Sequence, residues 1–429
     1  MSKNVVIVGG GLAGLAASIY LARGGRTVTV FEKRRYLGGR AITQLRHGYR
    51  FNLGAHAFYR TGAGAAVCRE LGIPVRGAVP KPNAVALING QERRLPTTFL
   101  SLLGTSLLSL RGKAQLGRAL WRIRSIDRNP PAPSQTVRGW IDEQVSDPRA
   151  RQVLEALIRL ATYSNHADTA GAALALAQMK VALRGAIYIH EGWQRIIDAM
   201  HSTAISAGVN FVSSSRIVGI DTEGGQVRAI RLGGLEVDAD RMDTQAVAFP
   251  EMTPEAVDGA RLPAETVILA VDPATASELT GQNWTVTPIT AACLDVALRS
   301  LPKPKRNFAL GIDDPLYFAV HSVWAQLTPK GGALIQSVKY GGTAADEPVL
   351  EGLLDRMQPG WRDLVVHRRF MPALTVSNAL VPPNVSRPAA VTNVRGLYLA
   401  GDWVGDEGLL SDAALASART AAKAVLANA

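Results

Sequence analysis

The feature that most restricts the fold of this chain is a glycine-rich turn next to its start. Residues 4–8 (NVVIV) have the continuous β-branched composition of a buried parallel strand. Gly9, Gly11 and Gly14 follow at once in the pattern G-x-G-x-x-G, and residues 15–23 then have helical periodicity. In such a turn the first glycine makes the tight bend, the second lets the backbone approach a pyrophosphate, and the third lets helix and strand pack closely.

A second strand and an acidic residue complete the pattern. Residues 27–31 (TVTVF) are strand-like and end at Glu32. A carboxylate about 20 residues after the glycines accepts hydrogen bonds from an adenosine ribose and repels a 2′-phosphate. The free N–H groups at the helix start favour the phosphates themselves. The first 32 residues therefore predict a dinucleotide-binding unit, and NADP is disfavoured.

The net charge of the chain excludes some kinds of binding partner but does not identify one. Lysine and arginine number 47 against 35 acidic residues, which gives a formal charge of +12. Positive potential attracts anionic ligands, acidic membrane surfaces and nucleic acid alike. The arginines are scattered and no nucleic-acid motif occurs, so we do not expect nucleic acid as a partner. A solvated basic surface and attraction to a membrane or an anionic substrate both stay open.

Cysteine usage and hydropathy suggest a cytoplasmic protein without a metal site. The chain has two cysteines, Cys68 and Cys293, which lack metal-ligand spacing and cannot form a disulfide framework. No secretory signal opens the chain, and its longest apolar stretch, 98–110, is shorter than the roughly 18 residues that span a bilayer. At 429 residues the chain suits two domains.

The segment after Glu32 identifies the dinucleotide. It reads KRRYLGGRA and contains Gly39 and Arg40. The whole block 5–41 closely resembles the start of the flavin amine oxidase and phytoene desaturase superfamily, in which this G-G-R segment packs along the pyrophosphate and flavin. The resemblance implies non-covalently bound FAD, with Arg40 at a phosphate or the flavin; the alternative is a surface arginine after a turn.

Three further blocks resemble the same superfamily. Residues 51–56 (FNLGAH) are similar to a stretch that passes the isoalloxazine ring, and residues 188–198 (YIHEGWQRIID) to a Y-x-x-G-G segment in which Glu191 replaces the first glycine. Residues 217–220 (IVGI) correspond to a strand that borders the adenine. Residues 396–425 (GLYLAGDWVGDEGLL…) resemble the closing motif of the family.

The closing motif also makes physical sense by itself. Residues 397–400 form a short apolar strand that ends at Gly401 and Asp402, and an alanine-rich helix starts near Ser411. Free N–H groups at that helix start would face the flavin edge where negative charge develops on reduction. We expect Asp402 to bind the ribityl chain rather than to cap the helix, because Ser411 is a better-placed cap.

The resemblance and the motifs together imply one set of cofactor-binding residues and no metal. The set is Gly9, Gly11, Leu12, Ala13, Gly14, Glu32, Lys33, Gly39, Arg40, Gly54, Ala55, His56, Ile217, Val218, Gly401, Asp402, Leu409 and Leu410.

The predicted fold class is α/β. A Rossmann-like FAD-binding domain of the glutathione-reductase type, with two dinucleotide-binding motifs, is expected over residues 1–80, 186–280 and 385–429. A discontinuous α+β substrate domain is expected over 81–185 and 281–384.

Finer elements are also predicted inside these two domains. They are helices over 100–126 and 136–163, strands at 291–298 and 333–338, a hairpin turning at 223–225 and an inserted loop at 240–262.

The helical region 98–124 has two interpretations. It combines an apolar stretch with five basic residues. Lipid-facing desaturases of the superfamily touch membranes through such a region, and a basic amphipathic helix binds an anionic leaflet. The alternative is a helix that closes the substrate cavity.

The resemblance implies hydride transfer to the flavin but leaves the substrate open. Amine oxidases of the superfamily keep a lysine on a strand of the substrate domain, and residues 290–296 contain none. Carotenoid desaturases end with a proline-glycine-rich loop where this chain has GDEGLL. We therefore expect a phytoene-desaturase-like reaction that dehydrogenates an apolar or amphipathic substrate. The expected electron acceptor is oxygen or a quinone. Oxidation of a C–N bond and a non-redox role for FAD are the alternatives.

Few titratable residues are candidates for catalysis. His56 could shuttle a proton as a neutral imidazole or pack structurally beside the cofactor. Asp406, with Glu407, could be a base or a turn residue. A polar cluster of Tyr163, Asn165 and His166 could face the cavity or end a helix.

Overall fold

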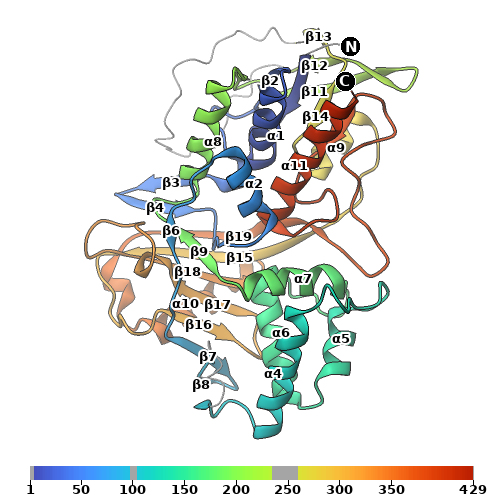
Figure 1. Ribbon diagram of the computed structural model, residues 1–429. Helices are drawn as coiled ribbons and strands as arrows, with labels where there is room; N and C mark the ends of the chain where they lie inside the picture. Colours follow the sequence, from blue (N-terminus) through green and yellow to red (C-terminus); the bar gives the residue numbers. More distant parts are fainter. Residues whose placement is uncertain (1–3, 97–103, 234–258, 429) are drawn as a thin grey trace.

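The computed structural model describes residues 4–96, 104–233 and 259–428. It has two parts, and Figure 1 places the first strand and the last helix of the described residues in the same one. That part contains a parallel sheet flanked by helices, and the other contains a large, mainly antiparallel sheet with a group of helices on one side.

The parallel sheet has five strands in the order β10-β2-β1-β14-β20. Every neighbouring pair is parallel, and the strands come from the start, middle and end of the chain. Their bounds are β1 (Asn4–Val8), β2 (Thr27–Phe31), β10 (Asn210–Val212), β14 (Val267–Leu269) and β20 (Leu397–Leu399). This arrangement confirms the predicted Rossmann-like class, because distant segments supply one doubly covered parallel sheet.

Helices cover the parallel sheet, and small residues let them approach it closely. Helix α1 packs against α11, whose buried face is mostly alanine, as at Ala418, Ala421 and Ala422. The helices of this part are α1 (Leu12–Arg23), α2 (Ala63–Leu71), α8 (Gln194–Ser206), α9 (Pro273–Thr280) and α11 (Leu410–Ala427).

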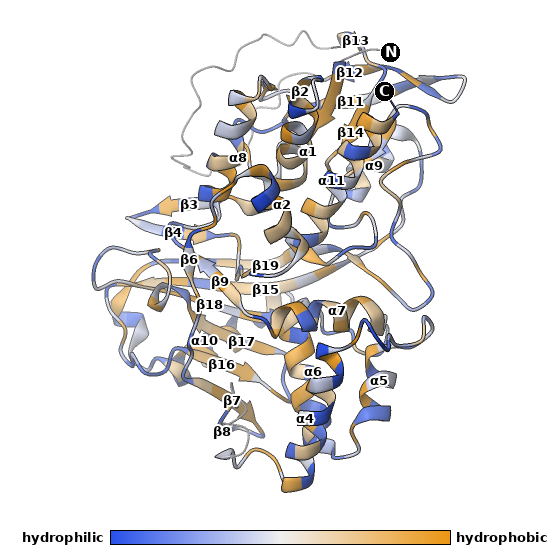
Figure 2. Cartoon of the chain, viewed as in Figure 1, coloured by the Kyte–Doolittle hydropathy of each residue, from blue (hydrophilic) through white to orange (hydrophobic). Residues whose placement is uncertain are grey.

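The second sheet has seven strands in the order β19-β15-β18-β17-β16-β7-β8. All pairs are antiparallel except β16 with β7. The bounds are β7 (Ala84–Ile88), β8 (Gln91–Arg94), β15 (Thr287–Leu298), β16 (Phe308–Gly311), β17 (Leu316–Val320), β18 (Ala333–Tyr340) and β19 (Val365–Leu380). Its central strands are mostly apolar, as the orange colour in Figure 2 shows.

Both faces of this sheet are covered, so consecutive residues of a strand, which point to opposite faces, are both buried. Ala292 and Leu294 of β15 belong to a core with α10 (Glu347–Met357). Ala291 and Cys293 belong to a core with the opposite helices. Those helices are α4 (Leu110–Arg124), α5 (Val137–Gln144), α6 (Pro148–Thr162) and α7 (Ala172–Ala182).

Short strands join the two parts. They are β3 (Thr43–Arg46) with β4 (Tyr49–Asn52), and β5 (Phe58–Tyr59) and β6 (Gly77–Ala78) with β9 (Ala186–Ile189). The predicted hairpin is present as β11 (Ile217–Glu223) and β12 (Gln226–Leu232), with β13 (Arg261–Pro263) beside it.

Several element boundaries differ from the sequence expectations. The single helix expected over 136–163 is two helices, because α5 ends before Val145 and α6 begins at Pro148, a residue suited to a first turn. The loop expected at 240–262 lies mostly outside the described residues, and its last residues form β13. The domain boundaries stay a prediction.

Candidate functional site

A long groove of about 1030 Å³ lies along the carboxyl ends of the parallel strands and reaches the large sheet. It begins at the β1–α1 turn, passes the start of α11 and ends at β15, β18 and β19. Most of the predicted cofactor-binding residues line it together. They are Gly9, Gly11, Leu12, Ala13, Glu32, Lys33, Gly39, Arg40, Ala55, His56, Ile217, Val218, Gly401, Asp402 and Leu410.

Four predicted residues do not line the groove. Gly14 and Gly54 lie behind its wall, and Leu409 lines a second, smaller cavity. Asp406 is exposed in the loop before α11, and its neighbour Glu407 is bound by Arg419 at 2.8 Å. The geometry therefore does not support Asp406 as a base at the groove.

The β1–α1 turn forms a cradle for phosphate. Gly9 has φ +104°, a conformation that favours glycine, and no side chain caps the helix start at Gly11. The first hydrogen bond of the helix joins the Leu15 N–H to the Gly11 carbonyl. The preceding helical amides, such as those of Leu12 and Ala13, thus have no partner within the helix and present the positive dipole end to the groove. A dinucleotide diphosphate fits this cradle.

Gly14 serves packing rather than ligand contact. A Cβ added to it would lie 1.9 Å from the Gly9 carbonyl oxygen and 3.4 Å from Ala270 Cβ. Only glycine lets the helix approach the turn this closely.

Glu32 ends β2 with its side chain at the groove and only 8% of its surface exposed. Its carboxylate accepts hydrogen bonds from the Gly10 N–H at 2.8 Å and the Arg34 N–H at 3.0 Å. Burial raises the pKa of Glu32, and these two amides oppose that effect. The carboxylate is held at the place where a ribose would lie against the β1–α1 turn.

Arg40 and Asp402 form an ion pair across the middle of the groove. Their closest atoms are 2.7 Å apart, and Asp402 is buried. Asn378 adds hydrogen bonds from its backbone N–H and its side chain, each 2.9 Å. Burial alone would raise the pKa of Asp402, but Arg40 and Asn378 outweigh it and lower that pKa. The Arg40 side chain is 41% exposed, yet through this ion pair it joins the N-terminal segment to the closing motif.

The start of α11 lies beside this ion pair and differs from the expectation in one detail. The residue before the helix is Leu409, and no side chain caps the helix. Ser411 lies inside the first turn, so the prediction that Ser411 caps the helix is wrong. Leu410 and Ser411 line the groove, and amides of an uncapped first turn are suited to the electron-rich edge of a flavin.

His56 stands on the loop after β4, at the wall of the groove. Its Nδ1 is 3.1 Å from the Gly54 carbonyl oxygen, and its ring meets that of Trp193 edge to face at 5.3 Å. Burial lowers the pKa of His56 to about 4, so the imidazole is neutral at physiological pH. Trp193, within the 188–198 block, also lines the groove and was not singled out from sequence.

Buried polar groups of the large sheet hold this loop from behind. Gln336 donates to the Gly54 carbonyl at 2.6 Å, and Arg369 donates to the Asn52 carbonyl. Arg369 also pairs with the fully buried Asp295 at 2.5 Å. Because these contacts join strands β15, β18 and β19 to one loop, sequence spacing gives no signal for them.

The end of the groove at the large sheet is apolar. Its walls include Cys293 on β15, Val338 on β18, and Leu374 and Val376 on β19, with Tyr163 after α6. Among the described residues none of the groove's carboxylates belongs to these strands. The carboxylates lie elsewhere: Glu32 and Asp402 as described above, and Asp272 and Glu278 in the α9 segment.

A comparison with protein families now identifies the class. The family model described as flavin containing amine oxidoreductase matches residues 12–293. The chain belongs to this family and is an FAD-dependent oxidoreductase, consistent with the groove and its phosphate cradle.

Curated relatives point to more than one activity. The chain is 36% identical over 129 residues to a putative flavin-containing monoamine oxidase, AofH, of Mycobacterium tuberculosis; the match covers 30% of this chain and 27% of that protein. It is 22% identical over 291 residues to a 4,4'-diaponeurosporene oxygenase of Staphylococcus aureus, covering 58% and 57% of the two chains. The matches thus span only part of each relative's length.

A solved structure shows the same fold over nearly the whole chain. The crystal structure of an oxidoreductase from Methanosarcina mazei superposes with a TM-score of 0.76 at 19% sequence identity, covering 98% of this chain and all of that one.

Proposed function

We propose that this protein is an FAD-dependent dehydrogenase that removes hydride from an apolar or amphipathic substrate and forms a C=C bond. The observation that carries the proposal is the apolar far end of the groove, formed by Cys293, Val338, Leu374 and Val376. A substrate that bound there as a cation would need a buried carboxylate to offset its lost hydration. Among the described residues the strands of that end offer only Asp295, which is already paired with Arg369.

The proposed chemistry asks little of the side chains. FAD, held by the groove, supplies a two-electron acceptor for the hydride. The apolar walls hold a substrate C–H bond against the ring and exclude water. His56, neutral and at the groove wall, accepts the proton that leaves the neighbouring carbon and passes it to solvent. The electron acceptor would be oxygen or a quinone.

Anaerobic reduction of the FAD-loaded protein tests this proposal. We expect a partly saturated isoprenoid hydrocarbon in detergent to bleach the flavin and a primary alkylamine of similar length to leave it oxidised. The reverse pattern would support C–N oxidation, and no bleaching by either donor would support a non-redox role.

The role of His56 is tested in the same assay. His56→Leu should slow bleaching by at least about 100-fold while the flavin content stays unchanged, because general base catalysis contributes about that much. Equal rates in the two proteins would leave His56 a packing residue beside the cofactor.

We further propose that α4 brings the protein to an anionic membrane surface, where apolar substrates reside. Leu110 and Trp121 lie on one face of this helix, since their spacing is close to three turns, and they are 84% and 68% exposed. The helix contains no acidic residue and five basic ones: Arg111, Lys113, Arg118, Arg122 and Arg124. Among the described residues, no helix is long and apolar enough to cross a membrane.

Sedimentation with vesicles of anionic phospholipid tests the membrane contact. We expect binding at low salt, a loss at high salt through screening, and much weaker binding of Trp121→Glu. Val349→Glu, at an exposed site on α10, is the matched control and should bind like the wild type. Equal binding of the two variants, or none by the wild type, would overturn the proposal.

A further inference from the structure

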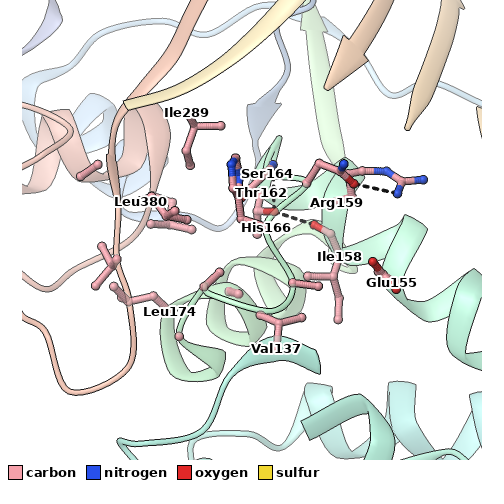
Figure 3. A pocket seen from close by; sticks show the side chains of 18 residues that line it. Val137, Glu155, Ile158, Arg159, Thr162, Ser164, His166, Leu174, Ile289 and Leu380 are labelled. Atoms are coloured by element: carbon pink, nitrogen blue, oxygen red, sulfur yellow. Dashed lines mark hydrogen bonds between the residues drawn. The ribbon is translucent and has the colours of Figure 1, made fainter. Parts of the chain in front are cut away.

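A second cavity, of about 40 Å³, lies between α6, α7 and the ends of β15 and β19. Figure 3 shows the side chains of Ile289, Leu380, Leu174, Val137 and Ile158 around it. Most of its lining is apolar: Val137, Ile158, Ala167, Ala170, Leu174, Ala175, Ile289, Ala379, Leu380, Val381 and Leu409.

This cavity and the flavin groove share one wall. At four places, consecutive residues line the two cavities on opposite sides. The pairs, with the groove residue first, are Tyr163 and Ser164, Pro288 and Ile289, Asn378 and Ala379, and Leu410 and Leu409. A single layer of chain therefore separates the second cavity from the apolar end of the groove.

Most polar side chains of the second cavity already have a hydrogen-bond partner, whereas the buried Nε of Arg159 has none among the described residues. Their partners are Arg138 for Glu155 at 2.9 Å, Asn165 for Arg159 at 3.1 Å, the Ile158 carbonyl for Thr162 at 2.9 Å, and His166 for Ser164 at 3.3 Å. A charged ligand would have to break these pairs. The chemistry that remains for a ligand is mainly apolar contact, with the unpaired donor at Arg159 Nε.

Two strained residues stand in the shared wall. Tyr163 and Leu410 have φ values of +59° and +57°, a left-handed conformation that large side chains rarely adopt. In both cases the side chain lines the groove while the adjacent residue lines the second cavity. Backbone strain of this kind gathers at ligand sites, so the wall is a place where ligand binding would be expected.

We infer that the second cavity is a subsite for the apolar, non-reacting end of the substrate. This inference rests on the proposed function and deepens it. A volume of 40 Å³ holds about three water-sized groups, which suits the end of a hydrocarbon chain rather than a whole chain. To enter it from the groove, the end of the substrate would have to displace the side chains of Leu409 and Leu410 in the shared wall, while the reacting carbons stay beside Cys293 and Leu374.

Calorimetric titration of the FAD-loaded protein with straight-chain 1-alkanols of increasing length tests the subsite. While added carbons enter apolar space, each CH₂ should tighten binding roughly fourfold, as expected for about 0.8 kcal/mol per buried methylene. The gain should stop once the subsite is filled. Leu174→Phe should bring that limit to a shorter alkanol and Leu174→Ala to a longer one. Ala173→Phe, exposed on the same helix, should match the wild type.

The two Leu174 variants move the limit in opposite directions, so one informative variant suffices if the other does not fold. The same limit in wild type and Leu174→Ala, or no alkanol binding by the wild type, would overturn the inference. Flavin bleaching by an apolar donor is measured separately, so failure of the subsite and failure of the proposed reaction are distinguishable.

Discussion

The two ends of the groove are built by different physical means. At the β1–α1 turn the contacts come from backbone N–H groups and from glycines that let the chain approach closely. At the large sheet they come from side chains such as Leu374 and Val338, supported by the buried Arg369–Asp295 pair. The cofactor end is set by local conformation, and the substrate end by tertiary packing.

This difference is consistent with the different activities named for the two curated relatives. A cradle of main-chain amides tolerates little change in the glycines that make it, whereas apolar walls can be repacked at modest cost. The comparison also predicts how each end should respond to substitution.

The largest effect on stability is expected from breaking the Arg369–Asp295 ion pair, which supports the substrate end of the groove. Arg369→Met leaves Asp295 as a buried, unpaired carboxylate and should lower the free energy of unfolding by about 3–5 kcal/mol. Urea unfolding measures this, and the double variant Arg369→Met with Asp295→Leu should recover most of the loss. A loss below about 1 kcal/mol in the single variant would show that the pair does not hold this end.

The next largest effect is expected from a substitution that disrupts the β1–α1 turn at the cofactor end. Gly14→Ala places a Cβ 1.9 Å from the Gly9 carbonyl oxygen and should cost about 3 kcal/mol and most of the bound FAD, because a backbone contact cannot relax. Gly117→Ala in α4, where nothing lies within 4 Å, is the control and should gain up to about 1 kcal/mol. Flavin content and urea unfolding report both, and normal flavin content in Gly14→Ala would contradict the account.

A smaller effect concerns the pH dependence of stability. The pKa of His56 is about 4 when folded and about 6.5 when unfolded. As pH falls from about 6.5 to 4, only the unfolded chain gains the proton, so the free energy of unfolding decreases. His56→Gln should show a shallower decrease over this interval than the wild type. Parallel curves would mean that the histidine is not desolvated at the groove wall.

The smallest effect is expected in the loop before α11. Asp406 is exposed and outside the groove, so Asp406→Asn should change the rate of anaerobic flavin reduction by less than about twofold, in line with a solvated surface residue. A large loss of rate would restore Asp406 as a base and place this loop with the substrate end.

Most of the cofactor-binding residues predicted from sequence lie together in the groove, because their signals are contiguous along the chain. The turn from Gly9 to Gly14, the acid Glu32, and the closing motif with Asp402 each lie within a few residues of the elements that place them. The same segments also predict the parallel sheet, because the strand of the closing motif, β20, lies in one sheet with β1 and β2.

The rest depends on contacts between distant segments. Asn378 reaches Asp402, and Arg369 reaches both Asp295 and Asn52, only after the large sheet has formed. No spacing rule relates these positions. Sequence did not predict the break between α5 and α6 or the uncapped start of α11, because periodicity and residue type do not determine the residue at which a helix begins or ends.

A crystal structure of the FAD complex tests the central claim most directly. The account predicts the diphosphate over the amides of Leu12 and Ala13, the ribose at Glu32, and the isoalloxazine ring beside His56 and Leu410. A diphosphate bound elsewhere, or a ring pointing away from the β15 and β19 end of the groove, would contradict it.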